Sequence, residues 1–244
     1  MAAAGAGAVV QMEPSRRRRY LHELGIPVWI ERHREHLSIA APDKPAFPIA
    51  EPRSGSAEQP VWDALRGEVS ACTQCTLHQS RTQTVFGVGR HDADLLVIGE
   101  APGADEDRQG EPFVGRAGRL LNAMLSSIGC PRDDVYIANI LKCRPPQNRD
   151  PKIEESSACT PFLNRQIKLI EPRAILALGR IAAQWLLQTD QAIGKLRGQV
   201  LVYGESQIPM VVTYHPAYLL RNPIAKAKSW QDLCLIRELL TSES

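Results

Sequence analysis

Apolar residues between positions 61 and 240 follow two patterns that alternate along the chain. Short, continuous apolar runs are typical of parallel strands buried on both faces of a sheet, and longer stretches with an apolar residue every three or four positions are typical of amphipathic helices. The runs predict strands at 94–99, 135–139, 174–179 and 210–213. The periodic stretches predict helices at 61–70, 116–128, 151–170, 180–188 and 224–240.

Alternation of strands and helices predicts an α/β fold, a three-layer α/β/α sandwich around a central four-stranded, mostly parallel sheet. We also expect a hairpin near 196–206, and a helix that starts with Asp150 as N-cap and Pro151 at the first helical position. Ligands of such sheets bind beyond the carboxyl ends of the strands. The residues expected to form the site are therefore 99–103, Asn139, Gly179 and 214–217.

Composition indicates one domain preceded by an extension. The chain has 244 residues, of which 43% are hydrophobic and 23% charged, and this suits a globular domain with a core plus a tail. Five prolines between positions 41 and 60 are typical of a linker. We expect residues 1–59 to be an N-terminal extension and Pro-rich linker, partly disordered, and residues 60–244 to be the functional domain.

Charge and hydropathy exclude some classes of protein. The net charge is +2, so no global field indicates nucleic-acid binding, although Lys142, Arg144 and Arg149 surround Cys143 in a basic cluster of the kind that is usually a solvated face. No apolar run approaches the roughly 20 residues that span a bilayer, and the N-terminus lacks the basic region of a secretory signal. We expect no membrane partner and a reducing compartment.

Four of the six cysteines have the spacing of a metal centre. Grouped cysteines in a chain without a secretory signal bind metal more often than they form disulfides. Spacing alone leaves a structural zinc and an iron–sulfur cluster equally open. Cys130 and Cys234 have no partner by spacing and are expected to be buried, inert thiols. The four candidate ligands are Cys72, Cys75, Cys143 and Cys159.

The loop after the first predicted strand, at 99–107, reads Gly-Glu-Ala-Pro-Gly-Ala-Asp-Glu-Asp. Its glycines and proline fix a tight turn that a ligand can approach, but it is acidic and lacks the glycine–lysine pattern of nucleoside-triphosphate sites. Phe113, Asn139 and His215 each have an ordinary structural explanation, as a core ring, a turn amide and a structural imidazole. Only their convergence on one edge of the sheet indicates a site.

Taken in order, four motifs and the four cysteines resemble the uracil-DNA glycosylase superfamily, specifically its iron–sulfur branch, family 4. The resemblance covers about residues 61–240 and is specific because all the motifs occur together. It implies that the four cysteines bind a [4Fe–4S] cluster. The motifs are Gly-Glu-Ala-Pro-Gly at 99–103, Pro-Phe-Val-Gly at 112–115, Asn-Ile-Leu-Lys-Cys-Arg-Pro-Pro at 139–146 and Tyr-His-Pro-Ala at 214–217.

The resemblance implies a DNA repair enzyme, with residues 60–244 as its catalytic domain. Such an enzyme flips deoxyuridine out of DNA because the target atoms are inaccessible in the stack. It then hydrolyses the N-glycosidic bond, releasing uracil and leaving an abasic site for base excision repair. The expected partner is single- or double-stranded uracil-containing DNA, and the expected protein is a monofunctional, monomeric enzyme of a bacterial-type cytoplasm.

Residue roles follow from the same resemblance. Phe113 matches the ring that stacks on the flipped base, and Asn139 matches the amide that reads its Watson–Crick edge. His215 matches the donor to uracil O2, where negative charge develops. The implied catalytic residues are His215, Glu100 and Asn139. The implied substrate-binding residues are Gly99, Glu100, Ala101, Asp105, Glu106, Phe113, Asn139 and His215.

The resemblance also implies how the attacking water is positioned, how thymine is excluded and which residues contact DNA. Ala101 stands where the best-known branch has a water-orienting Asp, which leaves backbone, Glu100 or substrate phosphates for that task and implies a dissociative mechanism. Either Asp105 or Glu106 closes the pocket near C5 and excludes the thymine methyl group. The DNA contacts implied are a minor-groove wedge at Leu219 or Leu220, with Arg221 and Arg144 on phosphates.

Three other classes of protein remain to be compared with this interpretation. A non-catalytic metal-thiolate DNA-binding module would not need Phe113, Asn139 and His215 together. A covalent uracil-DNA-binding relative carries an inserted loop with a nucleophilic histidine before its third cysteine, whereas residues 139–143 are uninterrupted here. An electron-transfer protein would not need the acidic pocket loop.

Overall fold

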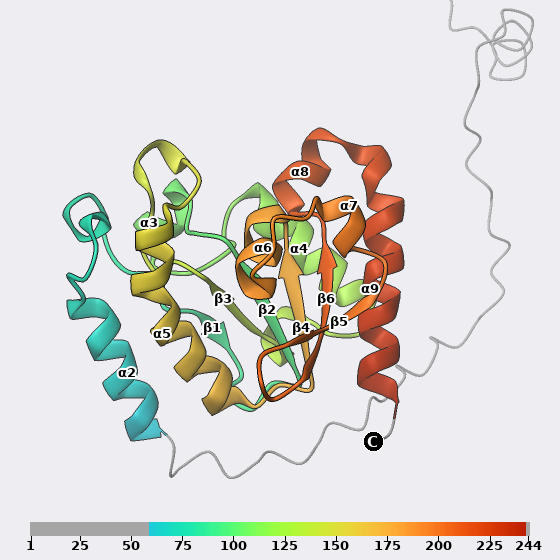
Figure 1. Ribbon diagram of the computed structural model, residues 1–244, viewed down its shortest axis with the longest axis horizontal. Coiled ribbons are helices and arrows are strands. Elements are labelled where there is room, and N and C mark those ends of the chain that lie inside the picture. Colours follow the sequence, from blue (N-terminus) through green and yellow to red (C-terminus); the bar gives the residue numbers. More distant parts are fainter. Residues whose placement is uncertain (1–58, 243–244) are drawn as a thin grey trace, which may run out of the picture. The chain divides into compact units, whose positions relative to one another are not determined.

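A six-stranded mixed sheet, with strand order β1-β3-β2-β4-β6-β5, forms the centre of the fold (Figure 1). The computed structural model describes residues 59–242, all of which belong to one compact unit. The predicted boundary at residue 59 stays a prediction, because residues 1–58 lie outside the described part. The strands are β1 (Val88–Gly89), β2 (Leu95–Gly99), β3 (Tyr136–Asn139), β4 (Ala174–Leu178), β5 (Val200–Tyr203) and β6 (Ile208–Thr213).

The four strands predicted from apolar runs form the parallel centre of the sheet, in the order β3-β2-β4-β6. The predicted count of four strands is wrong, because an antiparallel strand is added at each edge. β1 has only two residues, too few to leave a pattern in the sequence. β5 is the first arm of the expected hairpin, and β6 itself is the second arm, with Tyr203 paired to Ile208.

Helices occupy all five predicted positions, and three short helices were not predicted. They are α2 (Gln59–Ala71), α3 (Ala104–Gln109), α4 (Arg116–Ser127), α5 (Ile153–Ile170), α6 (Arg180–Leu187), α7 (Ile193–Leu196), α8 (Pro216–Arg221) and α9 (Lys226–Thr241). Single 3-10 turns occur at Thr76–Gln79, Arg132–Asp134, Pro146–Asn148 and Pro223–Ala225. Within residues 59–242, none of the helices has the length and apolar character needed to cross a bilayer.

The predicted start of α5 is wrong by two residues. Its N-cap is Lys152 rather than Asp150, and Pro151 lies before the helix. The buried carboxylate of Glu155 accepts a hydrogen bond from the Lys152 backbone N–H at 2.9 Å and two from the Arg149 guanidinium at 2.6 and 2.8 Å. This capping box, one turn inside the helix, sets the boundary more strongly than Asp150 does.

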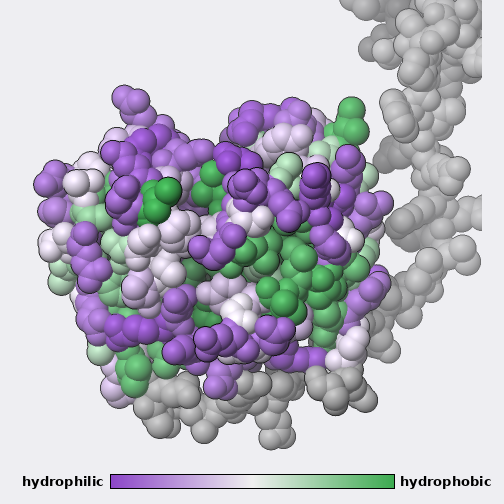
Figure 2. All heavy atoms as spheres, in the orientation of Figure 1, coloured by the Kyte–Doolittle hydropathy of each residue, from purple (hydrophilic) through white to green (hydrophobic). Residues whose placement is uncertain are grey.

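Two apolar cores lie on the two faces of the sheet. Leu96 and Ile98 of β2 pack into one core with residues of α2, α5 and α6, whereas Leu95 and Val97 pack into the other with residues of α4 and α9. The alternation follows from the two-residue period of a strand and explains why the apolar runs are continuous. In the view of Figure 2, apolar atoms remain exposed over β4 and β6, between α5 and α9.

Asp232 links three elements at the β5–β6 side of the fold. Its fully buried carboxylate on α9 accepts hydrogen bonds from Thr213 Oγ1 of β6 at 2.8 Å and from the Gly198 backbone N–H at 3.0 Å. The Arg197 guanidinium donates to both carboxylate oxygens, at 2.8 and 3.1 Å. The carboxylate therefore holds the segment before β5 against α9.

We expect Asp232→Ala to lower the free energy of unfolding by about 3–5 kcal/mol, because it leaves the Arg197 side chain, which is only 12% exposed, without its carboxylate partner. Urea unfolding followed by circular dichroism measures the change. Glu68→Ala is the matched control, since Glu68 also pairs with an arginine, Arg165, but on the exposed surface. A loss in Asp232→Ala no larger than in this control would contradict the role of Asp232.

Candidate active site and thiolate centre

The carboxyl ends of the central strands bring the predicted site residues together. Gly99 ends β2, Asn139 ends β3, and the two are paired directly in the parallel register. Gly179 and His215 follow β4 and β6 at the same edge, and a Cβ atom on Gly179 would lie 3.0 Å from His215 Cβ. The prediction of a site at this edge, made from the strand pattern, agrees with this geometry.

Gly99 is a glycine because two side chains occupy the space beside it. A Cβ atom at this position would lie 2.7 Å from Phe113 Cζ and would also collide with Asn139 Oδ1. Phe113 itself has a φ of 55°, a left-handed conformation that costs a non-glycine residue of order 1–3 kcal/mol. Its carbonyl rests on Gly118, where any Cβ would overlap the Phe113 backbone. The close approach of Phe113 and Asn139 at this strand end therefore depends on two glycines and one strained aromatic residue.

Asn139 presents an unpaired acceptor at this edge. The residue is 2% exposed, and its Oδ1 atom is buried without a hydrogen-bond partner. Most buried polar atoms are paired, so an exception at a strand end indicates a ligand that supplies the donor. The other such atoms among the described residues, Trp62 Nε1 and Ser229 Oγ, belong to helices α2 and α9.

His215 is oriented as a donor. Its ring centroid lies 5.6 Å from that of Phe113. Its Nδ1 atom accepts a hydrogen bond from the Ala217 backbone N–H at 3.2 Å and so caps α8. Burial first, and then the charge of Arg221, lower the pKa of His215 to about 4. At neutral pH the ring is therefore uncharged, and its one proton must be on Nε2.

Glu100 follows Gly99 and has an altered acidity. Burial, and then the charge of Asp150, raise the pKa of the Glu100 carboxyl to about 7, while the charge of Arg180 opposes this. Arg180 and Asp150 form an exposed ion pair at 3.1 Å. A carboxyl that titrates near neutral pH at a pocket edge is typical of a functional site. Arg180 was not predicted, although its position directly after Gly179 placed it at the same strand end.

The Gly-Glu-Ala-Pro-Gly part of the loop is non-helical, as expected, whereas the acidic residues that follow form a short helix, α3, that was not predicted. Glu106 of α3 accepts hydrogen bonds from the backbone N–H groups of Gly103 at 3.1 Å and Val114 at 3.2 Å. Glu106 thereby clamps the segment that carries Phe113. Asp105 is exposed and pairs with Arg108 at 2.6 Å. Ala101 is half-buried and packs against the core shared by α2 and α5.

The expected DNA contacts differ in exposure. Leu219, one of the two wedge candidates, is fully buried in the core beside α4 and α9, so it is a packing residue. Leu220 and Arg221 of α8 are exposed. Arg144 lies after β3, where its Nε donates to Asn148 Oδ1 at 2.7 Å. α8 was not predicted from the sequence, and its helical period places Leu219 on the buried side of the helix and Leu220 on the exposed side.

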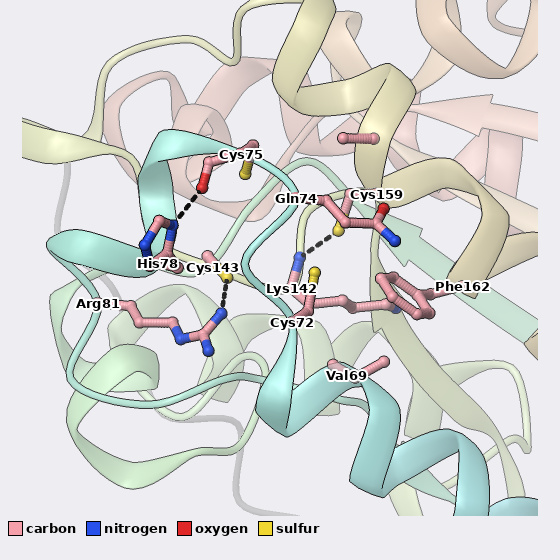
Figure 3. Close-up of a pocket in the computed structure, with 11 residues that line it drawn as sticks. Val69, Cys72, Gln74, Cys75, His78, Arg81, Lys142, Cys143, Cys159 and Phe162 are labelled. Atoms are coloured by element: carbon pink, nitrogen blue, oxygen red, sulfur yellow. Dashed lines mark hydrogen bonds between the residues drawn. The ribbon is translucent and has the colours of Figure 1, made fainter.

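The four predicted cysteines line one cavity (Figure 3). Cys72 and Cys75 lie between α2 and the turn at Thr76–Gln79, while Cys143 follows β3 and Cys159 lies on α5. Arg81 Nη1 donates to Cys143 Sγ at 3.1 Å, and the Lys142 backbone N–H donates to Cys159 Sγ at 3.2 Å. Donors aimed at sulfur suit thiolate ligands.

Four thiols that line one cavity have the chemistry of a metal centre. Within residues 59–242, no three His, Cys, Asp or Glu side chains are arranged to hold one metal ion. A structural zinc needs its thiolates gathered at about 2.3 Å from one atom. An iron–sulfur cluster binds each cysteine to a different iron and so spaces the sulfurs more widely.

The remaining thiols, Cys130 and Cys234, are half-buried rather than buried as expected.

Lys142 is buried rather than part of a solvated basic face. It is 1% exposed, and its Nζ donates to the Asn139 carbonyl oxygen at 2.9 Å and to Gln166 Oε1 at 2.6 Å. Burial lowers the pKa of the Lys142 ammonium to about 8. Sequence reasoning missed this placement, because a lysine between a strand and a cysteine gives no signal of burial.

Comparison with known proteins identifies the family. The sequence matches the uracil DNA glycosylase superfamily over residues 86–234. It is 43% identical over 183 residues to a type-4 uracil-DNA glycosylase of Archaeoglobus fulgidus, covering 72% of this chain and 92% of the relative. The type-4 enzyme of Thermotoga maritima is 47% identical over 165 residues, covering 66% and 84% respectively. The chain belongs to the type-4 uracil-DNA glycosylases.

Membership of the type-4 family confirms the resemblance read from the four motifs. A type-5 uracil-DNA glycosylase of Pyrobaculum aerophilum is less similar, with 31% identity over 149 residues. The superfamily match includes Cys143 and Cys159 but begins after Cys72 and Cys75. Two of the four cysteines therefore lie outside the region shared with the superfamily as a whole.

We expect Gly99→Ala to lower the free energy of unfolding by about 1–3 kcal/mol, because the added methyl group collides with Phe113 and Asn139. Gly67→Ala is the control, since Gly67 lies in α2 with nothing within 4 Å of its Cβ position. That helix substitution should stabilise the protein by up to about 1 kcal/mol. Urea titration of both variants measures the difference, and opposite results would contradict the crowding at Gly99.

Proposed function

We propose that the protein is a uracil-DNA glycosylase of base excision repair, which flips deoxyuridine from single- or double-stranded DNA and hydrolyses its N-glycosidic bond. The observation that carries this proposal is the buried, unpaired Asn139 Oδ1 atom beside the Phe113 ring. The type-4 relatives are uracil-DNA glycosylases by name. The alternative of a covalent uracil-binding protein lacks support, since residues 139–143 contain no histidine.

Base recognition follows from hydrogen-bond complementarity. Uracil stacks on Phe113, donates its N3–H to Asn139 Oδ1 and accepts at O4 from the Asn139 NH2 group. Cytosine presents an acceptor at N3 and a donor at C4, so both atoms of the amide would stay unpaired. Unpaired buried groups reject a ligand more strongly than a missing apolar contact does.

Bond cleavage is assisted where charge develops. As the C1′–N1 bond breaks, its electron pair leaves with uracil, and the sugar becomes cationic. His215 Nε2–H donates to uracil O2 and stabilises the anion, in the manner of an oxyanion hole. Water then adds to C1′. The Glu100 carboxylate orients this water and accepts its proton, a task for which no carboxylate is available at Ala101.

The clamped loop accounts for rejection of thymine. The Glu106 carboxylate accepts hydrogen bonds from the Gly103 and Val114 backbone N–H groups. It therefore acts by fixing the segments before α3 and after Phe113 rather than by touching the base. The loop that carries Asp105 and Glu106 then leaves no room for a methyl group at C5. We assign exclusion to this fixed loop rather than to either carboxylate alone.

DNA binding is assigned to the exposed residues near the pocket. Leu220 enters the gap left by the flipped base, and Arg221 and Arg144 contact phosphates. Apolar wedges of this kind offset the cost of unstacking. We propose that the protein acts as a monomer, in a reducing cytoplasm.

The four cysteines would hold a [4Fe–4S] cluster within the domain that we assign to residues 60–244. When bound, the cluster would cross-link three chain segments, those of Cys72 and Cys75, of Cys143 and of Cys159, and would supply no redox chemistry. The segment between Cys143 and Cys159 includes Arg144, so the thiolates would fix a DNA-facing loop.

Asn139→Ala should lower kcat/KM for uracil release at least about 100-fold, because both base-reading hydrogen bonds are lost. Release of free uracil from single- and double-stranded uracil DNA, by protein with its metal content verified, measures the effect. Asn164→Ala is the control, since Asn164 is exposed on α5 and bonds only to the Tyr203 hydroxyl among the contacts observed. Full activity in Asn139→Ala would remove Asn139 from its role.

The pH dependence should follow the Glu100 carboxyl. Since its pKa is raised to about 7, the active carboxylate predominates above pH 7 and is lost below it. Well below that value kcat/KM should fall about tenfold for each pH unit. His215 adds no titration above pH 5, because its pKa is about 4. Glu100→Gln should be slow and lack this slope; an unchanged pH profile in the variant would exclude Glu100 as the titrating group.

A further inference from the structure

Lys142 is a buried residue whose backbone contacts the thiolate centre and whose side chain contacts the base-reading residue. Its backbone N–H donates to Cys159 Sγ at 3.2 Å, as Figure 3 shows. Its Nζ donates to the Asn139 carbonyl oxygen at 2.9 Å. Neither contact is needed to complete the sheet, since Lys142 follows the end of β3.

Gln166 of α5 holds the Lys142 side chain in place. Gln166 Oε1 accepts from Lys142 Nζ at 2.6 Å. The Gln166 amide nitrogen donates in turn to the Phe86 carbonyl oxygen at 3.0 Å and to the Tyr136 hydroxyl at 3.2 Å. Because Gln166 is fully buried and its amide is bonded on both sides, the ammonium group has one fixed position.

Two groups next to residues that contact Lys142, namely the thiolate centre at Cys159 and the base read by Asn139, would carry negative charge during the reaction. Four thiolates outweigh the charge of a [4Fe–4S] core in its 2+ state, which gives a net charge of about −2. The departing uracil is also an anion. Like charges repel strongly in a water-poor interior, so an unscreened cluster would oppose cleavage of the glycosidic bond.

We propose that Lys142 is a positioning residue that fixes the backbone of Asn139 and screens the departing uracil from the negative charge of the thiolate centre. This inference rests on the proposed function. The screening acts on the transition state alone, because the base in DNA carries no charge, whereas the contact with the Asn139 backbone assists both base binding and cleavage. Arg81 is a second cation at the centre, but its hydrogen bonds reach Cys143 Sγ and the Ser70 carbonyl oxygen rather than Asn139.

The test compares Lys142→Met with Arg81→Met in the full-length, cluster-loaded protein. Lys142→Met should lower kcat about tenfold or more and raise KM by a smaller factor, since the screening is lost only in the transition state whereas the Asn139 contact also assists base binding. Both variants should shift the reduction potential of the cluster to more negative values, because each removes a cation that stabilises the reduced state. The loss of kcat should be much smaller in Arg81→Met.

Gln166→Leu keeps the lysine but removes the acceptor that fixes it. It should lower kcat in the same direction by a smaller factor, and combining it with Lys142→Met should add little, as expected for groups that act as a unit. If Lys142→Met fails to load its cluster, Gln166→Leu tests whether the fixed Lys142 ammonium assists cleavage. In that case an unchanged kcat in Gln166→Leu overturns the inference.

The outcomes separate this inference from the proposed function. Uracil release by the wild type, with kcat unchanged in loaded Lys142→Met, overturns the inference alone. Equal losses of kcat in Lys142→Met and Arg81→Met would also overturn it, since they would indicate a general effect of the cluster. A wild-type protein that releases no uracil would overturn both.

Discussion

The parallel pairing of β2 with β3 is the constraint on which the site depends. It places Gly99 directly opposite Asn139, and it does so at the sheet edge where the chain leaves both strands. Because neither strand can slip by one residue without turning its buried side chains to the wrong core, this register is fixed by the fold as a whole. The missing side chain at Gly99 then gives the Asn139 amide and the Phe113 ring a shared space.

Burial changes the acidity of two side chains at this edge of the sheet in opposite directions: it lowers the pKa of His215 and raises the pKa of Glu100. Burial keeps His215 neutral, so that it is a donor without being a competing acid. Burial also keeps Glu100 close to the point where it can gain or lose a proton. One physical cause, removal from water, thus lowers the pKa of an imidazole and raises the pKa of a carboxyl at the same edge of the sheet.

The sequence predicted those elements whose residue pattern reflects burial. It did not predict the short elements and buried side chains whose positions depend on tertiary contacts. Continuous apolar runs predicted β2, β3, β4 and β6, and with them the site edge. β1 is two residues long, and α3 depends on the Glu106 clamp, so neither leaves a periodic signal. The burial of Leu219 and Lys142 depends on partners distant in sequence, α9 and Gln166, which no local pattern specifies.

The unpaired Asn139 oxygen has a consequence for how the protein divides its free energy. An acceptor that is already dry in the free protein has had its hydration removed during folding, at a cost of about 1–3 kcal/mol. This cost lowers the free energy of unfolding of the free domain and is not subtracted from the free energy of binding a ligand. A ligand that supplies the missing donor therefore gains its full hydrogen bond on binding, and the domain is more stable with that ligand than without it.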